Sequence, residues 1–315
     1  MHRRNFLIAA LAASGAAGFR IRNAHADAKT LRIGYQKYGT LVLLKEKGTL
    51  EGALQPQGIT ITWTEFPGGP QLLEALNVGA IDFGTAGEAP PIFAQAAGAP
   101  LVYVGFEPPA PKGEAILVPK DSPLKSVADL KGKKVALNKG SNVHYLLVRA
   151  LEQAGLTPKD IQPVYLAPAD ARAAFEQGSV DAWVIWDPFF AAAAAATGAK
   201  ILQDGENLVS NHQFFLSERE FAKANPQVVD TIVAELTKVD EWAKSDPKGA
   251  AAILSPKVGI PAEVLEVALG RQGYGVRALT PEVVAEQQKI ADTFYKLGLL
   301  PKPISVSDAI VKLGS

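Results

Sequence analysis

The 315-residue sequence contains no cysteine and only four histidines. The lack of cysteine excludes disulfides, thiol nucleophiles and cysteine-based zinc sites. Two of the histidines, His2 and His25, fall in the leader described below, so only His144 and His212 remain for a metal site. We therefore expect neither a metal nor a cofactor, although residue counts leave a site built from carboxylates open.

The chain also has no excess of either charge, with 32 basic and 32 acidic residues. It has no basic stripe interleaved with aromatic residues, which argues against nucleic acid as a partner. With 48% apolar residues, the composition is that of an ordinary α/β protein that can bury one large core or two moderate ones. No Ser/His/Asp set, phosphate-binding loop or dinucleotide glycine motif stands out. These observations favour a binding protein over an enzyme.

The first 26 residues have the pattern of an export signal. Arg3-Arg4 precede an apolar run over residues 6–19, and Ala24-His25-Ala26 is a small-x-small cleavage pattern. The run is too short to span a bilayer. HRRNFLI resembles a twin-arginine motif, and the general secretory route is the alternative. We expect cleavage near Ala26 and a mature protein in the periplasm.

A similar pattern of residues occurs twice in the chain. QLLEALNVGAIDFGTAGEAPP over residues 71–91 and DARAAFEQGSVDAWVIWDPF over residues 170–189 each read as helix, glycine, apolar strand, acid and new helix. Three pairs of residues are 99 positions apart, namely Gly79 and Gly178, Asp82 and Asp181, and Glu88 and Asp187. This repeat predicts two similar lobes with a ligand between them.

Strand and helix patterns alternate along most of the chain, which is typical of βαβ units and a largely parallel sheet. Strands are predicted over residues 31–35, 59–66, 81–83 and 101–106, and, after a Pro-rich crossing at 107–112, over 135–137, 161–166 and 180–186. Residues 198–201 lead into a further predicted strand. Helices are predicted over 226–245, 247–254, 261–269, 281–297 and near 306–311. We expect an α/β fold in which lobe I comprises residues 27–112 and 214–315, and lobe II residues 113–213.

Three stretches resemble the aliphatic-sulfonate substrate-binding proteins of ABC importers: FPGGPQLLEALNVGAIDFGTAGEAPPIFAQAAGAPLVYVGFEPP, VADLKGKKVALNKGSNVHYLLVRALEQAGL and PADARAAFEQGSVDAWVIWDP. The resemblance covers nearly all of the mature chain. It implies a two-lobed type II periplasmic binding protein, with a two-stranded hinge, that closes around its ligand. The family tends to have a serine-containing loop after Gln-Lys, whereas this chain has Tyr38-Gly39-Thr40, which puts hydroxyl contacts from that loop in doubt.

A sulfonate is always an anion, so we expect it to bind to backbone N–H groups at strand-to-helix turns, where the helix dipole is positive. The candidate turns are Gly39-Thr40, Gly87-Glu88-Ala89 and Gly140-Ser141-Asn142, each of which follows a strand. Small residues there allow the backbone to approach the ligand closely. Most such turns bind nothing, and for Gly68-Gly69 a plain turn explains the sequence equally well.

Five side chains are further candidates for ligand contact. Trp186 ends a strand, so its ring could cover an alkyl tail or could simply be a core aromatic. Asp187 and Glu88 could read a polar tail, but capping of helix N-termini suits them better, because carboxylates repel a sulfonate. His144 is either an anion donor or a surface histidine, and Gln36 is a polar contact at a strand end.

The sequence therefore predicts a protein that captures aliphatic sulfonates and delivers them to the permease subunits of an ABC importer for sulfur acquisition, acting as a monomer. The alternative cargoes are taurine, nitrate and an aromatic sulfonate. A more distant alternative is an enzyme on the same fold, such as a thiamine-pyrimidine synthase or a chorismate-derived dehydratase. The former relies on a cysteine-rich segment, which this chain does not have.

Overall fold

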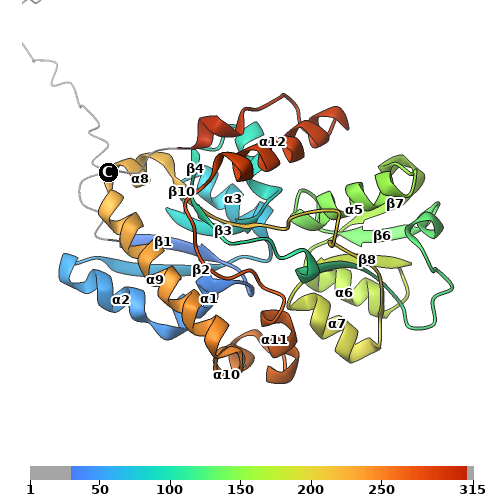
Figure 1. Cartoon of the computed structure of the whole chain (residues 1–315), viewed down its shortest axis with the longest axis horizontal. Helices are drawn as coiled ribbons and strands as arrows, with labels where there is room; N and C mark the ends of the chain where they lie inside the picture. Colours follow the sequence, from blue (N-terminus) through green and yellow to red (C-terminus); the bar gives the residue numbers. More distant parts are fainter. Residues whose placement is uncertain (1–29, 311–315) are drawn as a thin grey trace, which may run out of the picture.

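The computed structural model describes residues 30–310, which form two lobes side by side, one at the left of Figure 1 and one at the right. Each lobe contains a five-stranded sheet flanked by helices. The chain passes between the lobes after β4 (Leu101–Phe106) and again before β10 (Gln213–Glu218). The predicted export signal and its cleavage site lie outside the described residues.

The sheet of the first lobe has the strand order β2-β1-β3-β10-β4. Strands β1 (Thr30–Tyr35), β2 (Thr60–Glu65) and β3 (Phe83–Gly87) are parallel to one another. Strand β10 lies between β3 and β4 and is antiparallel to both. The alternation of Thr with apolar residues in β2 suits its place at the edge, where one face meets solvent.

The sheet of the second lobe has the order β7-β6-β8-β5-β9. Strands β6 (Lys134–Leu137), β7 (Gln162–Tyr165) and β8 (Ala182–Trp186) are parallel. Strand β5 (Glu114–Val118) runs antiparallel between β8 and β9 (Lys200–Asp204). This order repeats that of the first sheet, with β5 in the position of β10.

The predicted fold of two similar α/β lobes is confirmed, with one correction to the sheets. Each sheet is mixed, because the strand that enters from the other lobe, β5 or β10, inserts antiparallel. The sequence pattern gave no sign of β5, and residues 211–216 read only as a crossing segment. The third strand also begins later than predicted, so that Gly87 ends β3 and does not lie in a loop.

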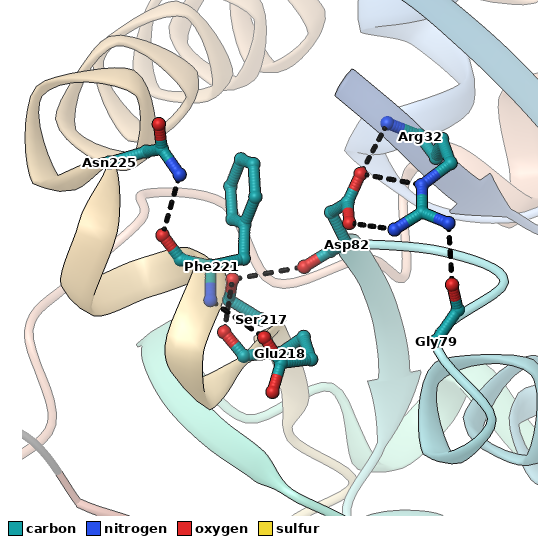
Figure 2. Close-up of polar contacts among 7 residues, drawn as sticks. All are labelled: Arg32, Gly79, Asp82, Ser217, Glu218, Phe221 and Asn225. Carbon is teal, nitrogen blue, oxygen red and sulfur yellow. Dashed lines mark hydrogen bonds and ion pairs between the residues drawn. The ribbon is translucent and has the colours of Figure 1, made fainter. Parts of the chain in front are cut away.

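A reciprocal contact with an aspartate fixes the start of the third strand in each lobe. Asp82 accepts a hydrogen bond from the Arg32 amide at 2.9 Å and donates its own amide to the Arg32 carbonyl at 2.8 Å. The Arg32 guanidinium also pairs with this carboxylate (Figure 2). In the second lobe Asp181 makes the same two backbone contacts with Lys134, both at 2.8 Å. The acids in the duplicated sequence therefore join neighbouring strands at their amino ends.

Helices cover both faces of the first sheet. One apolar core lies between the sheet and α1 (Thr40–Lys47), α2 (Thr49–Leu54), α9 (Pro226–Ser245) and α10 (Pro247–Val258). A second core lies under α3 (Gly69–Asn77), α4 (Pro90–Ala96) and α12 (Pro281–Lys296). Helices α1, α3 and α4 follow strands directly, so their N-termini lie at the carboxyl ends of the strands.

The second lobe contains one apolar core, which lies between its sheet and the helices α5 (Asn142–Gln153), α6 (Pro168–Glu176) and α7 (Phe189–Thr197). Helix α7 is largely alanine, and α11 (Ala262–Leu269), from the C-terminal part of the chain, packs against it. Figure 1 shows α11 at the bottom of the molecule, next to α7. The helical tail therefore contacts both lobes.

The end of β10 leads directly into a helix. Ser217 is a residue of β10, and its hydroxyl donates to the Asp82 carbonyl at 3.0 Å. The cap of α8 (Arg219–Ala224) is Glu218, which accepts from the Phe221 amide (Figure 2).

Within residues 30–310, no helix is long and apolar enough to cross a membrane.

Candidate functional site

The carboxyl ends of the strands of both sheets meet where the two lobes touch. A small polar cavity of about 10 Å³ lies there, which is room for roughly one water molecule. Residues of both lobes line the cavity, together with the second crossing segment, which connects β9 to β10. The lining residues are Gln36, Tyr38, Gly69, Gly87, Asn142, Trp186, Asn211 and Gln213. All eight residues are uncharged, so any anion held here would be bound by neutral donors.

Asn142, at the first position of α5, lies directly against Gly87 of lobe I. A Cβ atom on Gly87 would lie 3.0 Å from Asn142 Cβ, so only glycine fits there without displacement. The Asn142 amide donates to Asn211 Oδ1 at 3.0 Å and also to Glu114. Asn142 thus contacts lobe I and the crossing segment while it belongs to lobe II.

Gln36 and Gln213 form the part of the cavity that belongs to the first sheet. Gln36 Nε2 donates to the Thr85 carbonyl at 2.9 Å, and Gln213 Nε2 donates to the Thr85 hydroxyl at 2.7 Å. The hydroxyl in turn donates to the Phe214 carbonyl at 3.0 Å. Both amides are held in place by β3, and each retains a second N–H group.

A buried amide beside this cavity has no partner. Asn138 directly follows β6, and its Nδ2 makes no hydrogen bond within the described chain. This atom would lie 2.8 Å from a Cβ on Gly68, and the Trp186 ring would lie 3.6 Å from the same point. Gly68 precedes α3, so an unsatisfied donor from lobe II faces a helix N-terminus of lobe I. Such a pair of donors suits an anion.

Trp186 connects the polar cavity to a larger, mostly apolar slot. The slot has a volume of about 180 Å³ and shares Gln36 and Trp186 with the polar cavity. Its other lining residues are Lys37, Glu65, Phe66, Pro67, Ala167, Pro168, Ala169 and Phe189. The Trp186 ring stands edge-on to Phe189, with ring centroids 6.3 Å apart. The arrangement suits a ligand with one polar end and one apolar end.

Three buried glutamates lie near the segments that connect the two lobes: Glu88, Glu107 and Glu114. Each has one carboxyl oxygen without a partner in the described chain. Burial raises the pKa of Glu88 to about 8, against hydrogen bonds from the His212 and Asn211 amides. Burial also raises the pKa of Glu114, and the nearby Glu88 raises it further. The neutral form of Glu88 therefore predominates at neutral pH, and the raised pKa of Glu114 favours its neutral form as well, which weakens the repulsion of an anion by both acids.

Asp187 is fully buried and lies immediately after Trp186. Its Oδ1 accepts from the Ala191 amide at 3.0 Å in the first turn of α7, which is a capping contact. Its carboxylate also forms an ion pair with Arg271 at 3.1 Å. Burial raises the pKa of Asp187 to about 6, while Arg271 opposes that rise. The structure thus gives Asp187 two partners and no direct place in the polar cavity.

Thr40 also has partners away from the polar cavity. Its hydroxyl lies between the carboxyl groups of Glu107 and Asp240, and it accepts from Gln272 Nε2 at 2.9 Å. Burial raises the pKa of Glu107 well above its usual value, and the charge of Asp240 adds to this. Thr40 therefore links Glu107, in the first crossing segment, to α9. The preceding residue, Gly39, has a φ of 81°, a backbone conformation that favours glycine.

His144 lies in the contact between the lobes. Its Nδ1 accepts from the Gly140 amide at 3.2 Å, and its ring stacks on Phe93 of α4 with centroids 6.4 Å apart. The Phe294 ring of α12 is 5.4 Å away. Burial, together with the charge of Lys139, lowers the pKa of His144 to about 4, so the ring is neutral. These contacts assign His144 to packing between α5 and the helices of lobe I.

The remaining candidates frame the cavity through their backbones. Ser141 precedes α5, and its hydroxyl donates to the Asn138 carbonyl at 2.7 Å. Ala89 precedes α4 and is fully buried. Of the eleven predicted residues, the structure brings four into the cavity lining, namely Gln36, Gly87, Asn142 and Trp186.

Several residues of this region were not among the predicted contacts. The sequence indicates only a turn at Gly69, and it indicates only a loop at Tyr38. Asn138, Asn211 and Gln213 were not singled out, although each is a buried amide in or beside an apolar strand. That signal, a polar side chain at the end of a buried strand, could have identified Asn138.

The chain is similar to known proteins over most of its length. The family model described as "NMT1/THI5 like" matches residues 51–250. A relative of Escherichia coli (strain K12), named for the binding of aliphatic sulfonates, is 48% identical over 288 residues, which cover 91% of this chain and 90% of the relative. The names of this relative and of the two structures below describe binding, not catalysis.

Two solved structures are similar over most of the chain. The alkanesulfonate-binding protein SsuA of Xanthomonas axonopodis pv. citri, bound to MOPS, has a TM-score of 0.86 and 47% identity, and the match covers 91% of this chain and 99% of that one. The periplasmic aliphatic sulphonate binding protein SsuA of Escherichia coli has a TM-score of 0.82 and 48% identity, covering 91% and 93%.

Proposed function

This chain belongs to the NMT1/THI5-like family and groups with its aliphatic sulfonate-binding proteins, and we propose that it captures aliphatic sulfonates for an ABC importer. It binds its ligand without chemical change, closes its lobes and presents the ligand to permease subunits in the membrane. The Escherichia coli structure is named as that of a periplasmic protein, which supports a periplasmic location for this chain as well.

One observation carries the proposal: a neutral polar cavity and an apolar slot meet at Trp186. A sulfonate head has three oxygens that accept hydrogen bonds. Gln36 and Asn138 supply side-chain amide donors near the cavity, and Asn142 supplies a backbone N–H at the first position of α5. The alkyl tail would lie in the slot of about 180 Å³. Burying a tail contributes about 0.8 kcal/mol per methylene, so the slot favours alkanesulfonates over nitrate or sulfate, which have no tail.

We assign the roles within the site in three groups. Gln36, Gly87, Asn142 and Trp186 contact the ligand directly. Ser141 and Ala89 contribute backbone at the N-termini of α5 and α4. The other predicted residues support the site without contacting the ligand. Gly39 forms a turn, and Thr40 contacts Glu107 in the first crossing segment. Glu88 is a buried acid in its neutral form, His144 packs between the lobes, and Asp187 caps α7.

Closure accounts for the small size of the polar cavity. A space of about 10 Å³ has room for one water molecule, so the lobes must part for a sulfonate to enter, and the lining side chains must shift to hold it when the lobes close again. We take the moving bodies to be residues 27–112 with 214–315, and residues 113–213. We further propose that the protein acts as a monomer and that its leader is removed near Ala26.

A thermal-shift series tests the proposal. Saturating alkanesulfonates of two to eight carbons should raise the melting temperature by about a few degrees or more, because a ligand that binds only the folded state stabilises it. The same ligands recovered after long incubation should be unchanged when analysed by mass spectrometry. Stabilisation by nitrate alone, or turnover of the ligand, would contradict the proposal.

A further inference from the structure

Arg271 follows α11 and reaches across to the second lobe. Its Nη1 lies 3.1 and 3.3 Å from the two carboxyl oxygens of Asp187. The centre of its guanidinium also lies 4.1 Å from the centroid of the Phe190 ring, which is the geometry of a cation–π contact. The side chain is thus fixed from two sides, by the residue that follows Trp186 and by the first turns of α7.

Helix α11, before Arg271, packs against α7, whereas the residues that follow Arg271 are attached to the first lobe. Gln272 donates to the Thr40 hydroxyl at 2.9 Å, and Arg277 exchanges two backbone hydrogen bonds with Phe106 at 2.9 and 3.0 Å. A Cβ on Gly273 would clash with the Pro108 carbonyl, so this segment packs tightly on the first crossing segment. The ion pair therefore joins the lobe I scaffold to the carboxyl end of β8.

The charged surroundings of Asp187 are simple. Helix α7 has no charged residue, and Arg271 is the cation that contacts the carboxylate. The titratable groups nearby are Tyr38, which feels the charges of both Asp187 and Glu114, and Glu114 itself at the start of β5. Tyr38 also lines the polar cavity. An unbalanced charge on Asp187 would therefore act on an anion in the cleft across a short, dry distance.

We propose that Arg271 is a positioning residue for anion capture, which keeps the buried carboxylate beside Trp186 electrically balanced when the lobes close on a sulfonate. The inference rests on the proposed function and adds a residue to it that makes no contact with the ligand. A single uncompensated charge in a poorly solvated site changes affinity by about tenfold at an effective dielectric constant near 20.

The pH dependence separates this electrical role from simple support. Without Arg271 the pKa of Asp187 rises above its value of about 6, because the main influence that opposes burial is gone. In Arg271→Met, Asp187 therefore ionises at higher pH than in the wild type, and the charge that it gains as the pH rises is unbalanced. The variant should lose about tenfold more sulfonate affinity than the wild type between pH 6 and pH 9. Glu88 and Glu114 titrate in both proteins, so the ratio of the two dissociation constants removes their contribution.

The experiment measures hexanesulfonate binding by calorimetry at pH 6 and pH 9 in five proteins besides the wild type. Asp187→Asn retains the cap and leaves Arg271 unbalanced, so it should bind at least as tightly as the wild type at pH 9. The double variant Arg271→Met/Asp187→Asn should recover wild-type affinity there, and Arg271→Lys should retain the wild-type pH dependence. Arg149→Met, which removes an exposed arginine of α5, is the control and should not change the affinity ratio.

Two results would overturn the inference. One is equal weakening by Arg271→Met and Asp187→Asn at pH 9, as expected if the pair only holds the lobes together. The other is a loss in Arg271→Met that is the same at pH 6 and pH 9 and is not recovered in the double variant. Failure of the wild type to bind hexanesulfonate would instead overturn the proposed function.

Discussion

Gly87 of lobe I and Asn142 of lobe II touch so closely that a Cβ on Gly87 would lie 3.0 Å from Asn142 Cβ. This contact joins the carboxyl end of β3 to the first turn of α5, which are two of the turns where anion-binding N–H groups were predicted. The lobes can reach this arrangement only because residue 87 is glycine. Closure and ligand binding therefore depend on the same position.

Gly87→Ala should weaken alkanesulfonate binding by tenfold or more while it leaves the fold intact. The added methyl group would push Asn142 away by a few tenths of an ångström and so keep the lobes apart. Gly52→Ala is the matched control, because the space around Gly52 in α2 is open and alanine favours a helix. Calorimetry and urea denaturation together measure both effects. Unchanged affinity in Gly87→Ala would rule out the closed contact as part of the bound state.

Trp186→Ala should reduce the gain in affinity that each additional methylene brings. The ring lies between the polar cavity and the apolar slot, so its loss exposes the beginning of the tail. In the wild type the increment should approach about 0.8 kcal/mol per methylene while the slot is filling. Dissociation constants for sulfonates of two to eight carbons give this slope directly.

Trp242→Ala is the control for that series, because Trp242 lies on α9 against Lys47. It should leave the chain-length slope unchanged even if it lowers stability. A slope in Trp186→Ala equal to that of the wild type would show that the ring does not cover the tail.

Glu88 should make the protein less stable as pH rises from 5 to 8. Burial raises the folded-state pKa of Glu88 to about 8 from a usual value near 4.5, so the folded state holds more protons than the unfolded state in this range. Stability then falls with rising pH by at most about 1.4 kcal/mol per pH unit. Glu114, whose pKa is also raised, acts in the same direction.

Glu88→Gln should flatten this dependence, because glutamine imitates the protonated acid and does not ionise. The comparison is made by urea denaturation at pH 5, 6, 7 and 8 with the wild type, and with Glu74→Gln as an exposed control on α3. A wild-type slope of zero, or the same slope in Glu88→Gln, would mean that Glu88 is ionised in the folded protein.

Asp82→Asn should destabilise the protein by about 1–3 kcal/mol, since it removes the ion pair with Arg32 at a buried position. Asp181→Asn should cost less, because the hydrogen bond of Asp181 is to the Lys134 backbone and the residue is half-buried. Chemical denaturation ranks the two. Sulfonate affinity at a temperature where both variants are folded should stay at the wild-type value, because both residues lie at the amino ends of the strands.

The sequence was most informative where patterns are local. The strand at 101–106 and the helix at 226–245 have the predicted limits, because each is a single buried or amphipathic run. Strands β5 and β10 were missed because they gain their meaning only from the partner strands of the lobe that they enter. The duplication nevertheless predicted two lobes correctly, since Asp82 and Asp181 repeat one contact with a neighbouring strand.

The site was less accessible to prediction, for a physical reason. Gln36, Gly87, Asn142 and Trp186 each end a strand or begin a helix, which is a local signal. Asn211 joins them only through the crossing segment, which the sequence alone does not place. The acids illustrate the same limit, because the roles of Glu88 and Asp187 depend on burial and on distant partners such as Arg271.

Calorimetric titration of the mature protein with hexanesulfonate, taurine, nitrate and sulfate under one set of conditions tests the central claim most directly. The account predicts that hexanesulfonate binds more tightly than taurine, and that nitrate and sulfate bind weakly or not at all, because only hexanesulfonate fills both the polar cavity and the apolar slot. Binding of nitrate without binding of any sulfonate would contradict it.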